Sequence, residues 1–167
     1  MVRRLQVSKV SLAIETEKAG LKQVLLWRKS GKKVGFTNGC FDLLHPGHIA
    51  LLENSREHCD CLVVGLNSDR SVVKLKGPSR PIQDELSRKI ILMALEAVSF
   101  VIIFDEETPL RLIKLLSPDI LVKGADYEIE EIVGSEHVRS YGGEVLTVPY
   151  VEGKSSTALI NKFTLKR

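Results

Sequence analysis

Two histidines stand three residues apart in a turn between an apolar segment and an amphipathic one. They are His45 and His48, with Pro46 and Gly47 between them. Proline is favoured at the first position of a helix, and a helix N-terminus binds anions through free N–H groups and a partial positive charge. Residues three apart at a helix start face the same space, and Gly47 lets a phosphate approach the backbone. The turn predicts a site where His45 and His48 neutralise charge on a triphosphate.

A second candidate site lies in residues 74–81, which we expect to form a loop. The stretch contains three cations, Lys74, Lys76 and Arg80. In a strand-like register Lys74 and Lys76 point the same way, so the pair can clamp the phosphates of two substrates. A solvated loop with no ligand is the alternative. Arg88, on the helix expected next, is a further candidate for the same anionic pocket.

Three consecutive hydroxyl residues near the C-terminus suit a phosphate group. Ser155, Ser156 and Thr157 open the last predicted helix. A helix cap needs only one hydroxyl, so Ser155 alone explains a cap but not the run. The preceding Gly153 and Lys154 do not belong to a P-loop, because Val148 stands where that motif requires glycine.

A fourth segment, residues 122–127, follows a predicted strand. The small residues around Gly124 leave space for a nucleobase or ribose against the backbone, and Asp126 can accept a hydrogen bond from either. An ordinary turn at the end of a strand is the alternative.

The elements expected to position these segments alternate along the chain. The predicted strands are the apolar runs at residues 34–37, 61–66, 100–104, 120–123 and 144–148. The predicted helices are residues 11–29, 46–57, 84–98, 109–116, 130–141 and 155–163. This alternation predicts an α/β fold, a parallel sheet with helices on both faces. Ligands bind beyond the carboxyl ends of such strands, so we expect the functional edge at residues 38–48, 67–83, 105–108, 123–127 and 149–157.

Length and composition limit the class of protein. The 167 residues fit a single domain over residues 1–167, with residues 1–30 as a helical extension packed on it. The formal net charge of +3 suits anionic substrates, but basic tracts with interleaved aromatics, typical of nucleic-acid binding, are missing from the sequence. No apolar run reaches the roughly 18 residues of a membrane span. We therefore expect a cytoplasmic protein that binds neither nucleic acid nor membrane.

The cysteines predict neither disulfides nor a metal site. Three is an odd number, which argues against a disulfide framework. Cys59 and Cys61 lie beside His58, but zinc ligands usually have wider spacing, and small apolar residues at a strand start explain them better.

These motifs resemble a known family. The run Gly39-Cys40-Phe41-Asp42, then His45-Pro46-Gly47-His48, with Ser155-Ser156-Thr157, is similar to the cytidylyltransferase-like nucleotidyltransferase superfamily. The similarity is greatest to heptose 1-phosphate adenylyltransferase domains of ADP-heptose synthases, and covers about residues 8–163. It implies a Rossmann-like fold of the HxGH type and transfer of AMP from ATP to D-glycero-β-D-manno-heptose 1-phosphate, for lipopolysaccharide precursor synthesis. It also implies Mg²⁺ bound through the nucleotide phosphates, and a homodimer.

The resemblance also implies roles for individual residues. His45 and His48 would bind the triphosphate and stabilise the transition state, and Lys74 and Lys76 match a lysine pair that contacts phosphates. The implied nucleotide-binding residues are Gly39, Cys40, Phe41, Gly47, His48, Gly124, Asp126, Gly153, Ser155, Ser156 and Thr157. The implied substrate-binding residues are Asn38, Asp42, Lys74 and Arg88.

Two alternatives remain open at this point. A CTP-dependent cytidylyltransferase acting on glycerol 3-phosphate or another polyol phosphate would share the histidine turn, although related glycerol-phosphate enzymes carry arginine where this chain has Tyr150. A regulatory module would keep the nucleotide pocket without catalysis, but the intact histidine and lysine pairs favour an enzyme.

Overall fold

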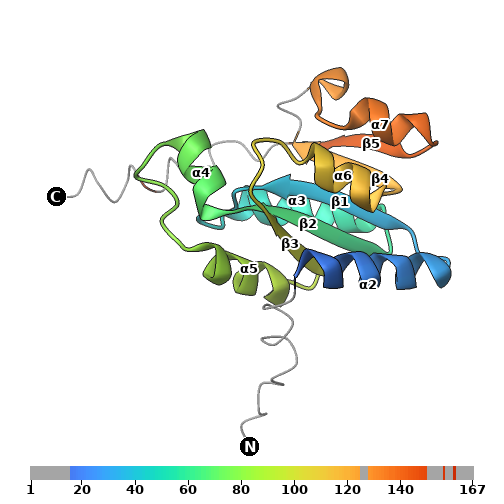
Figure 1. Ribbon diagram of the computed structural model, residues 1–167, viewed down its shortest axis with the longest axis horizontal. Helices are drawn as coiled ribbons and strands as arrows, with labels where there is room; N and C mark the ends of the chain where they lie inside the picture. Colours follow the sequence, from blue (N-terminus) through green and yellow to red (C-terminus); the bar gives the residue numbers. More distant parts are fainter. Residues whose placement is uncertain (1–15, 125–127, 150–155, 157–159, 161–167) are drawn as a thin grey trace, which may run out of the picture.

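Five parallel strands form one sheet in the order β3-β2-β1-β4-β5 (Figure 1). The computed structural model describes residues 16–124, 128–149, 156 and 160. The strands are β1 (Val34–Gly39), β2 (Cys61–Asn67), β3 (Phe100–Phe104), β4 (Ile120–Gly124) and β5 (Glu144–Val148). Each predicted strand is present, so the predicted parallel α/β fold is confirmed.

Helices cover both faces of this sheet (Figure 1). One face packs against α2 (Glu17–Lys29), α6 (Leu110–Leu116), α7 (Ser135–Ser140) and the short 3-10 helix η1 (Ile129–Glu131). The other face packs against α3 (Pro46–Glu57) and α5 (Glu85–Ala94). Strand β2, which lies between β3 and β1, is buried along its whole length, which explains why its sequence is almost continuously apolar.

The ends of β1 and β4 separate at the carboxyl edge of the sheet. The ladder between β1 and β2 continues to Gly39, whereas the ladder between β1 and β4 stops at Phe36, which is paired with Leu121. Strand order also reverses here. Strands β2 and β3 lie on one side of β1, and β4 and β5 lie on its other side. Such a switch point opens a crevice, and in open α/β sheets ligands bind there.

Helix α4 (Asp69–Lys76) lies where we expected a loop. The Ser68 hydroxyl caps it by accepting a hydrogen bond from Ser71 N at 3.1 Å, and the last turn carries Lys74 and Lys76, where cations suit the helix dipole. Residues two apart in a helix lie about 200° apart around its axis. The prediction that Lys74 and Lys76 point the same way was therefore wrong.

Three other predicted helices have different bounds. Helix α2 begins at Glu17 because Thr16 is extended, and residues 11–15 lie outside the described residues. Helix α5 begins after the capping residue Asp84 and ends at Ala94. The predicted helix at 130–141 is two pieces, η1 and α7, separated by a segment in which Gly134 has a φ of 91°. Of the predicted helix at 155–163, only Ser156 and Ile160 are described, and both are helical.

In the part of the chain that the structure describes, the helices are too short or too polar to cross a membrane.

Candidate active site

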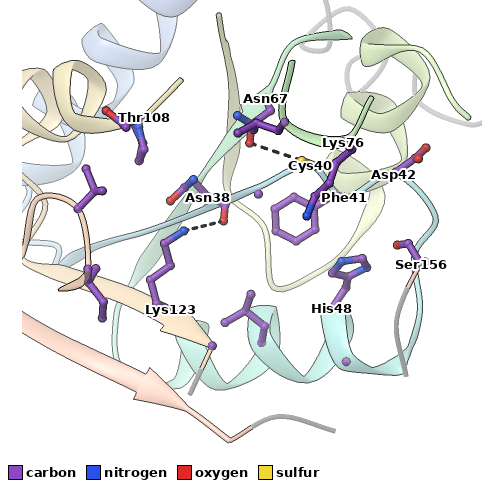
Figure 2. Close-up of a pocket in the computed structure, with 18 of the residues that line it drawn as sticks. Asn38, Cys40, Phe41, Asp42, His48, Asn67, Lys76, Thr108, Lys123 and Ser156 are labelled. Atoms are coloured by element: carbon purple, nitrogen blue, oxygen red, sulfur yellow. Dashed lines mark hydrogen bonds between the residues drawn. The ribbon is translucent and has the colours of Figure 1, made fainter. Parts of the chain in front are cut away.

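A cavity of about 510 Å³ lies at the carboxyl edge of the sheet (Figure 2). This volume is typical of small-molecule sites. Its lining comes from the ends of all five strands or the loops that follow them, and includes Asn38, Gly39, Asn67, Glu107, Thr108, Lys123, Gly124 and Val148. Segments that are far apart in the sequence therefore meet here, as the predicted functional edge requires.

The histidine turn forms one end of the cavity, at the N-terminus of α3. His45 is the N-cap residue, with an extended backbone, and its carbonyl accepts a hydrogen bond from His48 N at 2.9 Å. The two imidazole rings are stacked, with centroids 3.8 Å apart. Both rings thus lie side by side at the helix start, as their spacing predicts.

The two imidazoles are poorly suited to carry charge without a ligand. Burial, and then the neighbouring charge of His45, lower the pKa of His48 to about 4, although a backbone hydrogen bond at Leu43 acts in the opposite direction. Burial also lowers the pKa of His45. The Nδ1 atoms of both are buried and have no hydrogen-bond partner within the described residues. A triphosphate would supply the opposite charge that this helix start lacks, because its first turn contains no acidic residue.

Phe41 packs against the histidine turn through the ring of His48. Its φ of 44° lies in the left-handed region, which side chains other than glycine rarely adopt. Its buried ring packs close to Gly39, where an added Cβ would lie 3.1 Å from the ring, and the ring centroid is 5.1 Å from that of His48. The ring therefore holds His48 in place and leaves the backbone of the turn for a ligand.

Asp42 lines the cavity but is engaged within the protein. Its buried carboxylate accepts hydrogen bonds from Arg80 Nε at 2.6 Å, Ile82 N at 2.8 Å and Gln83 N at 3.1 Å. These bonds fasten the segment after α4 to the histidine turn. The structure thus gives Asp42 a positioning role in place of the predicted substrate contact.

Arg88 is likewise used internally, and the structure does not bring it to the cavity. Its fully buried guanidinium donates to the carbonyls of Cys40, Asn67 and Gln83, at 2.6, 2.9 and 2.9 Å, and to Asp69 at 2.7 Å. These contacts occupy four of the five N–H donors of the guanidinium, so the structure lends no support to the predicted contact between Arg88 and an anionic substrate. Arg88 joins the ends of β1 and β2 to α4 and α5.

Of the predicted lysine pair, only Lys76 lines the cavity, and it extends into it from the end of α4 (Figure 2). Arg80 lines it as well, and so does Lys123, whose ammonium donates to the Asn38 carbonyl at 3.4 Å. Arg80 belongs to the predicted cationic stretch at residues 74–81, whereas we did not predict Lys123 or Asn67 as site residues. The available signal was their position, because Asn67 and Lys123 stand at the carboxyl ends of buried strands.

The other predicted nucleotide-binding residues divide into two groups. Gly39, Cys40, Phe41, Gly47, Gly124 and Ser156 line the cavity. The Ser156 hydroxyl donates to the Leu43 carbonyl at 2.9 Å, which holds that residue against the histidine turn (Figure 2). Asp126, Gly153, Ser155 and Thr157 lie outside the described residues.

Comparison with known proteins identifies the family. The model of the cytidylyltransferase-like family matches residues 36–162, which include most of β1, the other four strands, the histidine turn and the cavity lining. The chain belongs to the cytidylyltransferase-like family. It is therefore a nucleotidyltransferase domain, and the resemblance noted in the sequence is confirmed.

Several cytidylyltransferase-like relatives are longer proteins named bifunctional protein HldE. The protein of Bradyrhizobium sp. (strain ORS 278) is 56% identical over 89% of this chain and 30% of its own length. That of Hyphomonas neptunium is 59% identical over 85% of this chain and 29% of its own length. The chain thus spans less than a third of the length of these curated relatives.

Solved structures support the same cytidylyltransferase-like fold. A lipopolysaccharide core biosynthesis protein from Thermoplasma volcanium GSS1 has a TM-score of 0.60 and 30% identity, over 74% of this chain and all of that one. A pantoate-beta-alanine ligase from Francisella tularensis has a TM-score of 0.54 at 16% identity, over 77% of this chain and 64% of that one. The second similarity shows the fold alone.

Proposed function

We propose that this domain transfers AMP from ATP to D-glycero-β-D-manno-heptose 1-phosphate, releasing ADP-heptose and pyrophosphate. The observation that carries the proposal is the stacked histidine pair at the start of α3, facing the same cavity as Lys76 and Arg80. The heptose assignment is supported by the sequence resemblance and by the identity to bifunctional HldE proteins. A lipopolysaccharide core biosynthesis protein among similar structures is consistent with a cell-surface sugar.

The reaction needs alignment and charge neutralisation more than acid–base chemistry. A phosphate monoester loses its second proton near pH ~6, so the sugar phosphate is a nucleophile near neutral pH. One of its oxygens attacks the α-phosphorus of ATP and forms a new P–O bond. The bond from the α-phosphorus to the bridging oxygen breaks, and pyrophosphate leaves with the electron pair. His45, His48 and Lys76 line the cavity, and in this proposal they stabilise the charge that develops.

Mg²⁺ fits this site as an ion bound by the phosphate oxygens of the substrate. The described residues contain no group of three or more histidine, cysteine or acidic side chains placed to hold a metal ion, and the Asp42 carboxylate is engaged by Arg80. Mg²⁺ binds hard oxygen ligands and commonly uses substrate phosphates with water. We therefore propose that the triphosphate oxygens hold the ion, which would offset negative charge on the leaving pyrophosphate.

The organisation of the protein is also a proposal. We propose that residues 1–167 act as one nucleotidyltransferase domain in the cytoplasm, with ATP and a sugar 1-phosphate as its ligands. The homodimer implied by the family resemblance is part of the same proposal, and size-exclusion chromatography with light scattering measures it.

The decisive experiment compares nucleotides and acceptors in one assay. Pyrophosphate release is measured with ATP or CTP, each with heptose 1-phosphate or glycerol 3-phosphate. We expect rapid release only with ATP and heptose 1-phosphate. Faster release with CTP and glycerol 3-phosphate would replace the proposal by a polyol-phosphate cytidylyltransferase. Nucleotide binding without release from any pair would indicate a regulatory module.

A further inference from the structure

The cavity has two walls that differ in charge. We name the first the cationic wall, and it consists of the charged side chains of Lys76 and Arg80 with the imidazoles of His45 and His48, whose pKa values burial lowers. Lys123, at the end of β4, is a further cation of the lining and belongs to neither wall. We name the second the acidic wall, and it consists of Glu107, Thr108, Pro109, Glu131, Ile132 and Val133. Helix α3, which begins at the histidine pair, packs on one face of the sheet, whereas the acidic wall leads into α6 and α7 on the other face. Figure 2 shows Thr108 across the cavity from His48 and Lys76.

In the acidic run after β3, only Glu107 is left without a partner. Asp105 pairs with Arg70, and Glu106 pairs with Arg111. Glu107 makes no hydrogen bond or ion pair with any residue that the structure describes, and it lines the cavity. The neighbouring ion pairs hold the backbone of this run, and the exposed Glu107 side chain extends from it at the rim of the cavity.

The acidic run around η1 has the same arrangement. Glu130 lies 3.5 Å from Arg139, while the Glu131 side chain has no hydrogen-bond or ion-pair partner among the described residues and lines the cavity. The two halves of the wall are packed together, because Gly134 lies so close to Ile113 of α6 that an added Cβ would be 2.8 Å from its side chain. The wall is therefore a built surface with two free carboxylates.

Carboxylates without a partner would repel the phosphate groups of the two substrates. Like charges 4 Å apart repel by roughly 4 kcal/mol near a protein surface. The acidic wall must therefore face an uncharged part of the substrates. Hydroxyl groups fit, because they donate hydrogen bonds and a carboxylate accepts them more strongly than a neutral oxygen does.

The nucleoside has separate space in the same cavity. Gly124 and Val148 at the ends of β4 and β5, with Leu51 of α3, give this part of the lining small and largely apolar side chains. A nucleobase and ribose suit this region, as the small residues after β4 predict. Once the phosphates and the nucleoside are assigned, the sugar ring of the acceptor is the uncharged part of the substrates that still needs a binding surface. The acidic wall is the part of the cavity lining that is still unassigned.

We propose that Glu107 and Glu131, with the hydroxyl of Thr108, bind the hydroxyl groups of the acceptor sugar and thereby select a polyhydroxylated sugar phosphate. The inference rests on the proposed sugar-phosphate acceptor and adds the residues that recognise it. The phosphate of the acceptor would lie toward the cationic wall, and its ring would lie against the acidic wall.

Steady-state kinetics of Glu107→Gln and Glu131→Gln test this role. Each variant keeps the size of the side chain and removes the charge. We expect KM for heptose 1-phosphate to rise roughly tenfold or more, as loss of a charged hydrogen bond implies, with KM for ATP unchanged. Glu128→Gln is the matched control, because Glu128 is an exposed carboxylate of the same segment that does not line the cavity.

A second measurement pairs each variant with acceptors that lack one hydroxyl. Heptose 1-phosphate analogues with a single ring hydroxyl replaced by hydrogen should be poor acceptors for the wild-type protein. For the analogue lacking the hydroxyl that Glu107 binds, Glu107→Gln should cause little further loss, because the two changes remove the same contact. A carboxylate with a merely structural role would give independent losses for every analogue.

The outcomes separate this inference from the proposed function. Suppose that the wild-type protein turns over heptose 1-phosphate, and that Glu107→Gln and Glu131→Gln have the same kinetic constants as the control Glu128→Gln. That result would overturn the inference and leave the proposed function standing. A fall in KM for ATP in these variants would also overturn it, because the carboxylates would then only repel phosphate. No wild-type turnover with any sugar 1-phosphate would overturn the proposed function, and the inference with it.

Discussion

The histidine turn and the buried charged residues behind it differ in how they use their hydrogen-bonding groups. His45 and His48 leave Nδ1 atoms without partners in the described structure, whereas Arg88 uses its guanidinium in four contacts. Asp42 accepts three hydrogen bonds. A buried polar group without a partner costs free energy, so such groups persist where a ligand completes them. Groups satisfied by the protein itself shape the cavity.

Loss of Arg88 should have the largest effect, and it should appear as a loss of stability. Arg88→Met leaves three buried carbonyls without their donor, so we expect the free energy of unfolding to fall by about 3–5 kcal/mol. Urea denaturation measures it. The control is Arg70→Met, which removes an exposed ion pair with Asp105 and should leave the free energy of unfolding close to the wild-type value. Equal losses in the two variants would contradict the positioning role of Arg88.

Loss of His48 should reduce turnover without comparable loss of stability. His48→Ala removes a group placed to neutralise transition-state charge, and we expect kcat to fall about 10²–10³-fold. Pyrophosphate release and urea denaturation, run on the same preparations, separate the two effects. His58→Ala, at an exposed helix end, should match the wild type in both. Near-normal turnover in His48→Ala would refute the role assigned to the histidine pair.

The two lysines at the end of α4 should differ in a way that the sequence alone does not predict. Lys76 lines the cavity and Lys74 does not. We expect Lys76→Ala to raise KM for ATP or for the sugar phosphate roughly tenfold, from the loss of one charge-assisted contact, and Lys74→Ala to change neither. Similar effects in the two variants would mean that α4 rearranges when substrates bind.

The effect expected to be smallest near neutral pH is a pH dependence of stability in the ligand-free protein. The folded-state pKa of His48, about 4, lies below the usual value of 6.5, so the unfolded chain binds more protons between these limits. Stability should therefore fall as the pH drops from about 6.5 toward about 4, and the decrease should be shallower in His48→Asn. Urea midpoints across this range test it. Identical pH profiles would show that His48 is not neutral in the folded protein.

The features that could be predicted from the sequence are those encoded by patterns of residues close together along the chain. The five strands follow from compact apolar runs, and the histidine turn follows from Pro46 and Gly47 between two imidazoles. Helix α4 was missed because its eight residues are too few to show a clear helical period, and Gly77 and two prolines follow directly. The residues next to Arg88 and Asp42 in the sequence also do not indicate that both side chains form hydrogen bonds with backbone groups far away along the chain.

The sequence by itself determined the alternating strands and helices, the family and the histidine pair, because each depends on residues close together along the chain. Only the tertiary structure decided which charged groups meet. Glu107, Lys123 and Lys76 face one cavity because the sheet order β3-β2-β1-β4-β5 brings their strand ends together. That order depends on pairing between distant segments, which local periodicity does not encode.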